Sequence, residues 1–225
     1  MRPGHRPRRE PADVVTYISA PDDLALHGVR VLGFPSASRV AVRYGLPLDR
    51  VEDTLLDFEA RGWVGNLSFG GSSGWSLTDA GKAENERRLA AELDRAGVRE
   101  TVAGAHATFV PLNRRFGTAC TDWQIRPTRL DPMAFNDHTS WPWDERVLQT
   151  LTSVATSFRG LCDQLARCLA RFGGYAGRYS SALAKVDRGQ HAWVDGHDRD
   201  SCHTLWIQFH EDLLATLGLP RGPDA

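Results

Sequence analysis

The sequence predicts a mainly α-helical protein that carries a single β-hairpin in its first third. Two observations support this fold class. Three short segments with apolar residues at helical spacing are followed by two apolar runs that enclose a glycine-rich turn at residues 69–74. Beyond residue 84, apolar residues recur every three or four positions in several long segments, which is the pattern of a helical bundle.

Composition limits the class of protein. The chain of 225 residues is long enough for two modules with separate cores, and no apolar run is long enough to span a membrane. The basic, proline-rich residues 1–20 lack the apolar centre of a secretory signal, so we expect a disordered arm on a cytoplasmic protein. The four cysteines have neither metal-site nor disulfide-framework spacing, and we expect free, buried thiols.

The first module is predicted to span residues 21–83 and begins with three helices. The first helix starts at Pro21. Ser36 is placed to cap a second helix of about two turns, which Gly45 ends. The third helix follows after a short turn and runs over residues 48–61. Helix, short turn and helix together predict a helix-turn-helix unit.

A hairpin follows the third helix. Trp63 begins one strand, residues 69–74 form the turn, and residues 75–77 return as the second strand. Thr78 then caps a further helix. Three helices, a hairpin and a capped helix in this order predict a winged helix-turn-helix domain with a two-stranded wing.

Two short stretches carry a resemblance to a known family. They are A-R-G-W-V at residues 60–64 and S-L-T-D-A-G at residues 76–81, at the two ends of the predicted wing. In these stretches the module resembles the MarR-like winged-helix transcription regulators of bacteria. The resemblance covers only the first module, and it implies a DNA-binding regulator whose third helix enters the major groove.

The side chains expected to contact double-stranded DNA lie on the second and third helices: Ser36, Ser38, Arg39, Arg43, Arg50, Thr54 and Arg61. Charge works against this prediction, because residues 36–62 hold four arginines and five acids and the wing turn has no basic residue. We expect the missing positive charge to come either from the arginines of the N-terminal arm or from Arg87 and Arg88 after the wing. The alternative is a winged-helix protein-interaction module whose acidic third helix docks on a basic partner.

Residues 84–225 are predicted to form a helical domain for dimerisation and effector binding. A helix from residue 98 to residue 123 carries an apolar stripe with a repeat of about 3.5 residues, which needs a partner helix in the same subunit or in a second copy. A long helix follows Trp141, and the last helix spans residues 201–217. We therefore expect a homodimer.

Polar and aromatic residues beside these apolar stripes are candidates for binding a small effector: Asn113, Trp123, His138, Trp141, His203, Trp206 and His210. Asp200 and His203 stand three positions apart on one helix face, a spacing that suits two ligands of one metal. This arrangement faintly resembles the FCD effector domains of GntR-type regulators, although no ordered match to their metal-binding motif exists. The other interpretation is that these side chains tie loops to the bundle and bind nothing.

The sequence contains no P-loop, dinucleotide fingerprint, nucleophile elbow or zinc-protease motif, so we do not expect an enzyme. No cofactor is predicted with certainty, and a bound metal is the weaker option. The combined prediction is a homodimeric, DNA-binding transcription regulator that responds to a small ligand held by its C-terminal helices.

Overall fold

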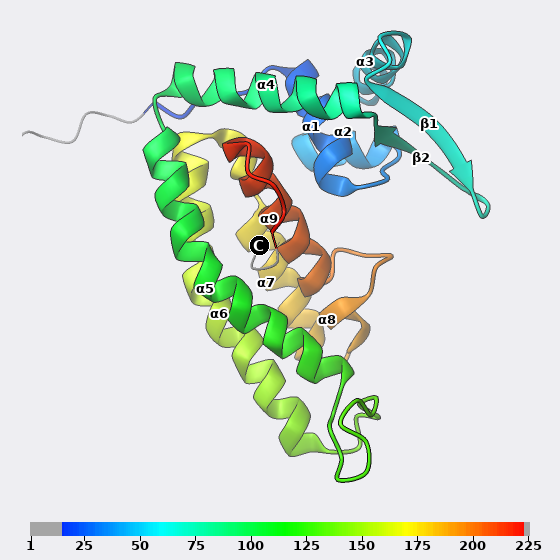
Figure 1. Ribbon diagram of the computed structural model, residues 1–225, viewed down its shortest axis with the longest axis vertical. Helices are drawn as coiled ribbons and strands as arrows, with labels where there is room; N and C mark the ends of the chain where they lie inside the picture. Colours follow the sequence, from blue (N-terminus) through cyan, green and yellow to red (C-terminus); the bar gives the residue numbers. More distant parts are fainter. Residues whose placement is uncertain (1–14, 223–225) are drawn as a thin grey trace, which may run out of the picture.

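The computed structural model describes residues 15–222 and confirms the predicted fold class (Figure 1). Three helices precede a two-stranded antiparallel sheet, and helices make up the rest of the described elements. The elements are α1 (Pro21–Leu32), α2 (Ala37–Tyr44), α3 (Leu48–Ala60), β1 (Val64–Phe69), β2 (Ser72–Leu77), α4 (Asp79–Ala96), α5 (Arg99–Gln124), α6 (Trp141–Cys168), the 3-10 helix η1 (Ala170–Phe172), α7 (Tyr175–Val186), α8 (Ala192–Asp195) and α9 (Cys202–Leu217).

Helices α1 to α3 and the hairpin form the head. Its core is one apolar cluster centred on Leu26, Val40 and Leu55, each of which is fully buried. The predicted caps are present: the Ser36 hydroxyl accepts a hydrogen bond from the backbone N–H of Arg39. Because caps satisfy the free backbone groups at helix ends, α2 begins after Ser36 and ends before Gly45, as the sequence predicts.

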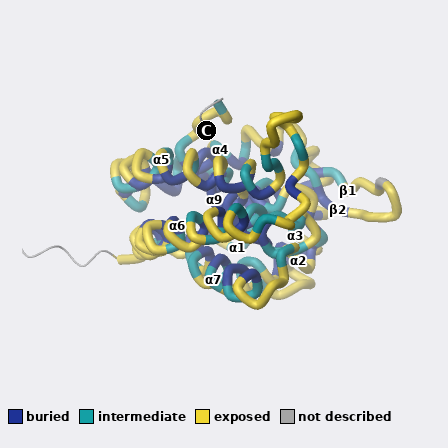
Figure 2. Tube along the Cα trace, turned by 90° about the horizontal axis from the view of Figure 1, so that it is seen from below, coloured by how far each residue is buried: buried dark blue, intermediate teal, exposed yellow. Residues whose placement is uncertain are grey.

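The wing is longer and its turn tighter than predicted. Strand β1 pairs with β2 from Val64 opposite Leu77 to Phe69 opposite Ser72, so Ser72 and Ser73 belong to the strand and not to the turn. Gly70 and Gly71 alone make the turn, with φ of 57° and 82°. Both angles are strained for residues with a side chain, which explains the glycine pair. The hairpin tip lies far from the bundle and is exposed (Figure 2).

Helix α4 joins the head to the rest of the molecule. The Thr78 hydroxyl accepts a hydrogen bond from the backbone N–H of Gly81, as expected of a cap. The helix packs against α1 at its start, and Leu93 near its end belongs to the core of the C-terminal helices. The predicted domain boundary after residue 83 thus falls inside a continuous helix.

Helices α5 to α9 form the bundle. The long helices α5 and α6 run antiparallel, with α7 and α9 packed beside them (Figure 1). The apolar stripe of α5, including Val102, Phe109 and Phe116, is buried against α6 and α9 of the same chain. The stripe therefore does not require a second copy. Within residues 15–222, no helix has the length and apolar character needed to cross a membrane.

The predicted arm is ordered where it meets the bundle. The backbone N–H of Tyr17 donates to the carbonyl of Cys168 at 2.9 Å, and the N–H of Ala170 donates to the carbonyl of Tyr17 at 3.0 Å. The prediction of disorder is thus wrong at Tyr17. Its extended backbone pairs with backbone groups that the end of α6 leaves without helical partners. The rest of the arm, residues 1–14, lies outside the described residues.

Candidate functional site

The end of α2 nearest the wing presents three of the predicted DNA-contacting residues together. Ser36, Ser38 and Arg39 occupy its first turn and the residue before it, and the Ser36 and Ser38 hydroxyls lie 2.8 Å apart. A groove of about 370 Å³ opens beside them between α2, α3 and the wing. Glu52 and Leu56 of α3 and Asn66 of β1 line the same groove. A helix start with two serine hydroxyls beside a wing is the part of this fold that suits phosphate contacts.

Helix α3 presents an acidic surface. Over residues 48–60 it carries five acids and one arginine, and all five acidic side chains are exposed. Its one arginine, Arg50, points back to α1, where its guanidinium lies 3.3 Å from Asp22. Thr54 is half-buried, and Arg61 lies beyond the helix end over the ring of Trp63. The structure therefore does not gather Arg50, Thr54 and Arg61 with the serines of α2.

Arg43 does not have its predicted role as a DNA contact. Its guanidinium points away from the α2 start and into the junction between head and bundle, where it donates to the carbonyls of Arg171 at 3.1 Å and Gly173 at 3.2 Å. It also lies over the rings of Tyr44 and Tyr175. An arginine held this way is not free to bind a phosphate of DNA. Arg39, one turn earlier, is half-exposed and lies 4.0 Å from Asp200.

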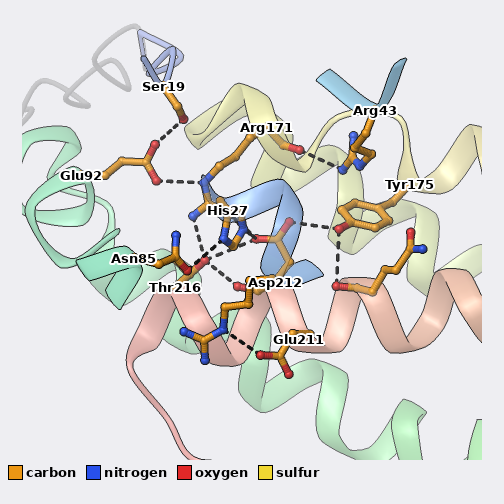
Figure 3. A network of polar contacts seen from close by, with 12 residues as sticks. Ser19, His27, Arg43, Asn85, Glu92, Arg171, Tyr175, Glu211, Asp212 and Thr216 are labelled. Atoms are coloured by element: carbon orange, nitrogen blue, oxygen red, sulfur yellow. Dashed lines mark hydrogen bonds and ion pairs between the residues drawn. The ribbon is translucent and has the colours of Figure 1, made fainter. Parts of the chain in front are cut away.

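A buried network of charged and polar side chains, which we call the junction network, connects the head to the bundle (Figure 3). Asp212 of α9 is its centre. One carboxylate oxygen of Asp212 contacts Arg171 and lies 3.0 Å from the His27 imidazole Nε2 of α1. The other oxygen accepts a hydrogen bond of 3.1 Å from the Tyr175 hydroxyl.

Arg171 extends the junction network to α4 and, through Glu92, to the segment that precedes α1. Its guanidinium donates to Glu92 at 2.8 Å and to the Thr216 hydroxyl at 2.7 Å. Glu92 in turn accepts a hydrogen bond from Ser19. The network thus joins segments from α1, α4, η1, α7 and α9 (Figure 3).

The electrostatics of the network are those of a closed structural centre. Asp212 is fully buried. Burial alone would raise the pKa of its carboxyl, but Arg171 and His27 hold that pKa well below its ordinary value. Because each charge is paired and shielded from water, the network fixes the head against the bundle and offers no group to a substrate.

Four of the predicted effector residues lie along the packed seam between α5 and α9. The Trp206 ring is buried and stacks on Phe116 with 4.2 Å between ring centres. Its indole N–H donates to the Asn113 side chain at 2.8 Å. His203 and His210 lie at the edge of the same seam, against Phe116 and Phe109 respectively. Trp206 therefore fills the core and does not line a cavity.

The other three predicted effector residues lie at the opposite end of the bundle. The Trp123 ring is buried 4.3 Å from the ring of His138, and His138 Nδ1 lies 3.1 Å from the Asp144 carboxylate. Trp141 is 60% exposed. The structure thus places the effector candidates His138, His203 and His210 in two separate groups, so these three histidines do not line one cavity.

His210 predicts a pH dependence of stability. Burial, together with the nearby Arg221 and His106, lowers the pKa of its imidazole to about 4. Because an unfolded histidine has a pKa of about 6.5, the unfolded state binds more protons between these values, and stability falls as the pH drops through this window. The full shift in pKa corresponds to about 3 kcal/mol.

We expect His210→Gln to reduce the loss of unfolding free energy between pH 6.5 and pH 4, measured by urea denaturation at each pH. Carboxylates contribute at the lower pH values in both proteins, so the difference between wild type and variant is the informative quantity. Parallel pH profiles for the two proteins would contradict the prediction.

The described residues show no metal centre. No group of three or more histidine, cysteine, aspartate or glutamate side chains within residues 15–222 is arranged to hold a metal ion. Asp200, the expected partner of His203, accepts a hydrogen bond of 2.9 Å from Arg178 instead. Burial would raise the pKa of the Asp200 carboxyl, but this hydrogen bond lowers the pKa below its ordinary value.

Sequence reasoning missed the junction network and the role of Arg178. One signal was present: Asp212 and Thr216 lie four positions apart, one turn after Gln208, on a buried side of the largely apolar last helix. A charged residue at such a position predicts a buried partner. The partner itself was not predictable, because His27 and Asp212 are 185 positions apart.

Comparison with known proteins gives no match: no family model, no curated protein and no solved structure is similar to this chain. The functional argument therefore depends on the residues themselves.

Proposed function

We propose that this chain is a DNA-binding transcription regulator of bacterial type that acts as a homodimer. The observation that carries the proposal is the winged helix-turn-helix head, in which the half-buried Ser36 and the exposed Ser38 and Arg39 stand at the start of α2 beside the wing groove. Two serine hydroxyls and a guanidinium are donors that suit DNA phosphates. The proposal assigns the chain no catalytic reaction.

The junction network supports a regulatory use of this head. A head that moved freely on a linker would not respond to events in the bundle. Here α4 is continuous from one to the other, and Arg171 and Asp212 of the bundle bind residues of α1 and α4. A change in the bundle would therefore alter the position of the head, and of the second head in a dimer.

The proposal predicts weak, salt-dependent binding that depends on Arg39. The acids of α3 repel phosphates, so affinity has to come from the α2 start and the arm. We expect fluorescence anisotropy with promoter DNA from beside its own gene to show binding at low salt that weakens steeply as salt rises. Arg39→Ala is expected to weaken binding on all sequences and to reduce the salt slope by about 1.

The matched control is Arg129→Ala, which removes an exposed arginine from the loop between α5 and α6 at the far end of the bundle (Figure 1). We expect this variant to bind DNA like the wild type. If neither promoter nor random duplex binds at low salt, the DNA-binding proposal fails. Size-exclusion chromatography with light scattering tests the homodimer separately.

The acidic face of α3 favours a second candidate, a winged-helix module that binds a basic protein partner. Leu56 in the middle of this face is 56% exposed, and carboxylates surround it. An apolar side chain ringed by acids suits a partner with lysines around an apolar contact. The double variant Asp53→Asn with Asp57→Asn separates the candidates: it should strengthen DNA binding by a regulator but weaken binding of a lysine-rich peptide by an interaction module.

A further inference from the structure

A second pocket lies where α2 meets the bundle, on the side of α2 away from the wing groove. Its volume is about 380 Å³. The polar lining comes from Ser38, Arg39 and Arg43 of α2 and from Arg178 and Asp200 of the bundle, and two apolar side chains complete the wall. The head and the bundle therefore each supply part of one site.

The lining has an excess of positive charge. Three guanidinium groups face one carboxylate, so the formal charge of the lining side chains is +2. Arg178 already uses two of its nitrogens, donating to Asp200 at 2.9 Å and to Gln208 at 3.0 Å. Asp200 also lies 4.0 Å from Arg39 and thus holds two of the arginines together.

Two of the arginines keep a buried donor without an acceptor. Arg178 Nη1 and Arg43 Nε are both shielded from solvent and have no hydrogen-bond partner within the described residues. Buried donors are rarely left unsatisfied, because the lost hydrogen bond to water is not replaced. Unsatisfied donors beside a pocket with excess positive charge indicate a place for an anionic acceptor.

We propose that this pocket binds a small organic dianion, a dicarboxylate or a phosphate monoester. Two negative charges balance the lining, anionic oxygens accept from Arg39 and Arg178, the charge of Arg43 adds to the attraction, and the apolar wall accommodates the carbon part of the ligand. Binding of the dianion does not depend on DNA binding. If the protein is the proposed regulator, the dianion bound at this site is its effector.

The position of the pocket gives the direction of regulation. Ser38 and Arg39 line this pocket and also belong to the α2 start that is proposed to contact DNA. A dianion that binds Arg39 removes one phosphate-binding charge from that surface. The ligand therefore releases DNA, and by linkage DNA weakens binding of the ligand.

Isothermal titration calorimetry with the full chain, in the absence of DNA, tests the site. The probes are inorganic phosphate, succinate and glycerol phosphate, and chloride at equal ionic strength is the reference. We expect saturable binding of at least one dianion. Arg178→Gln and Arg39→Ala should weaken binding about tenfold or more, because each removes a charged donor. Asp200→Asn should strengthen it, because it removes the competing carboxylate. Arg129→Ala is the matched control and should bind like the wild type.

Opposite effects at Arg178 and Asp200 cannot arise from a general loss of structure, and circular dichroism confirms that each variant is folded. No saturable heat from any dianion, or equal affinities for wild type, Arg178→Gln and Asp200→Asn, would overturn the proposal. Failure of the protein to bind DNA would leave these measurements unchanged. The two proposals are thus tested independently.

Discussion

Asp212→Ala is expected to lower the free energy of unfolding by about 3 to 5 kcal/mol. The carboxylate is fully buried and pairs with Arg171 and His27, while the Tyr175 hydroxyl donates to it. Removing it leaves the Arg171 guanidinium buried with fewer acceptors. Since small domains are stable by only about 5 to 15 kcal/mol, this loss is a large part of the total. Urea denaturation followed by circular dichroism measures it.

Two further variants show whether charge pairing is the cause. Asp94→Ala removes an exposed carboxylate that lies 3.2 Å from Arg99, and it should leave the denaturation midpoint almost unchanged. The triple variant Glu92→Gln, Arg171→Met and Asp212→Leu removes the three buried charges together and should recover part of the stability lost by Asp212→Ala alone. A wild-type midpoint for Asp212→Ala would show that the junction network does not stabilise the fold.

The junction network also predicts how unfolding responds to acid. The pKa of Asp212 is lowered in the folded state, so its contribution to stability is present above the pKa of an unfolded aspartate, about 3.9, and is lost as the pH falls below it. The contribution of His210 is lost at a higher pH, between about 6.5 and 4. The free energy of unfolding should therefore fall in two successive pH windows, the first set by His210 and the second by Asp212.

The local elements of the fold are predictable because their signals are local. Ser36 and Thr78 cap helices through hydrogen bonds to residues three positions away, and the pair Gly70–Gly71 adopts backbone angles that favour glycine. Each signal acts within a few residues. The same holds for the apolar stripes of the bundle helices, since helical spacing alone determines their buried face.

The candidate sites were less predictable, because their partners are distant in the chain. Helical spacing places Arg43 on the same side of α2 as Arg39 only approximately, and the choice between DNA and the bundle depends on carbonyls of Arg171 and Gly173, at least 128 positions away. The pocket lining shows the same effect, because Arg178 and Asp200 approach α2 only after the head docks. An arginine on a helix surface predicts that its guanidinium binds some hydrogen-bond acceptor, but the sequence does not show which acceptor that is.

Gly81→Ala is expected to displace the wing. The same contact explains why the S-L-T-D-A-G stretch has glycine at its last position. Gly81 lies in the first turn of α4, where an added Cβ would come 1.8 Å from the carbonyl oxygen of Trp63. That carbonyl accepts a hydrogen bond from the backbone N–H of Thr78 at 3.0 Å and is held in place. Relief of the clash requires the start of β1 to move away from α4, at a cost of about 3 kcal/mol.

Gly117→Ala is the matched control for this substitution. Gly117 is an exposed residue inside α5, and an added Cβ there would have no neighbouring atom within 4 Å. We therefore expect this variant to gain about 0.5 to 1 kcal/mol, because alanine loses less backbone entropy than glycine in a helix. Denaturation midpoints should thus move in opposite directions for the two glycine substitutions, and equal midpoints would contradict the close contact between α4 and the wing.

The same pair of variants tests the function of the wing. In the proposed regulator, the wing forms one wall of the groove beside Ser36, so displacing it should weaken promoter binding in Gly81→Ala at temperatures where the variant remains folded. Gly117→Ala should bind DNA like the wild type. If Gly81→Ala is folded, has a displaced wing by nuclear magnetic resonance shifts, and still binds DNA with wild-type affinity, the contacts proposed for the α2 start do not require the wing.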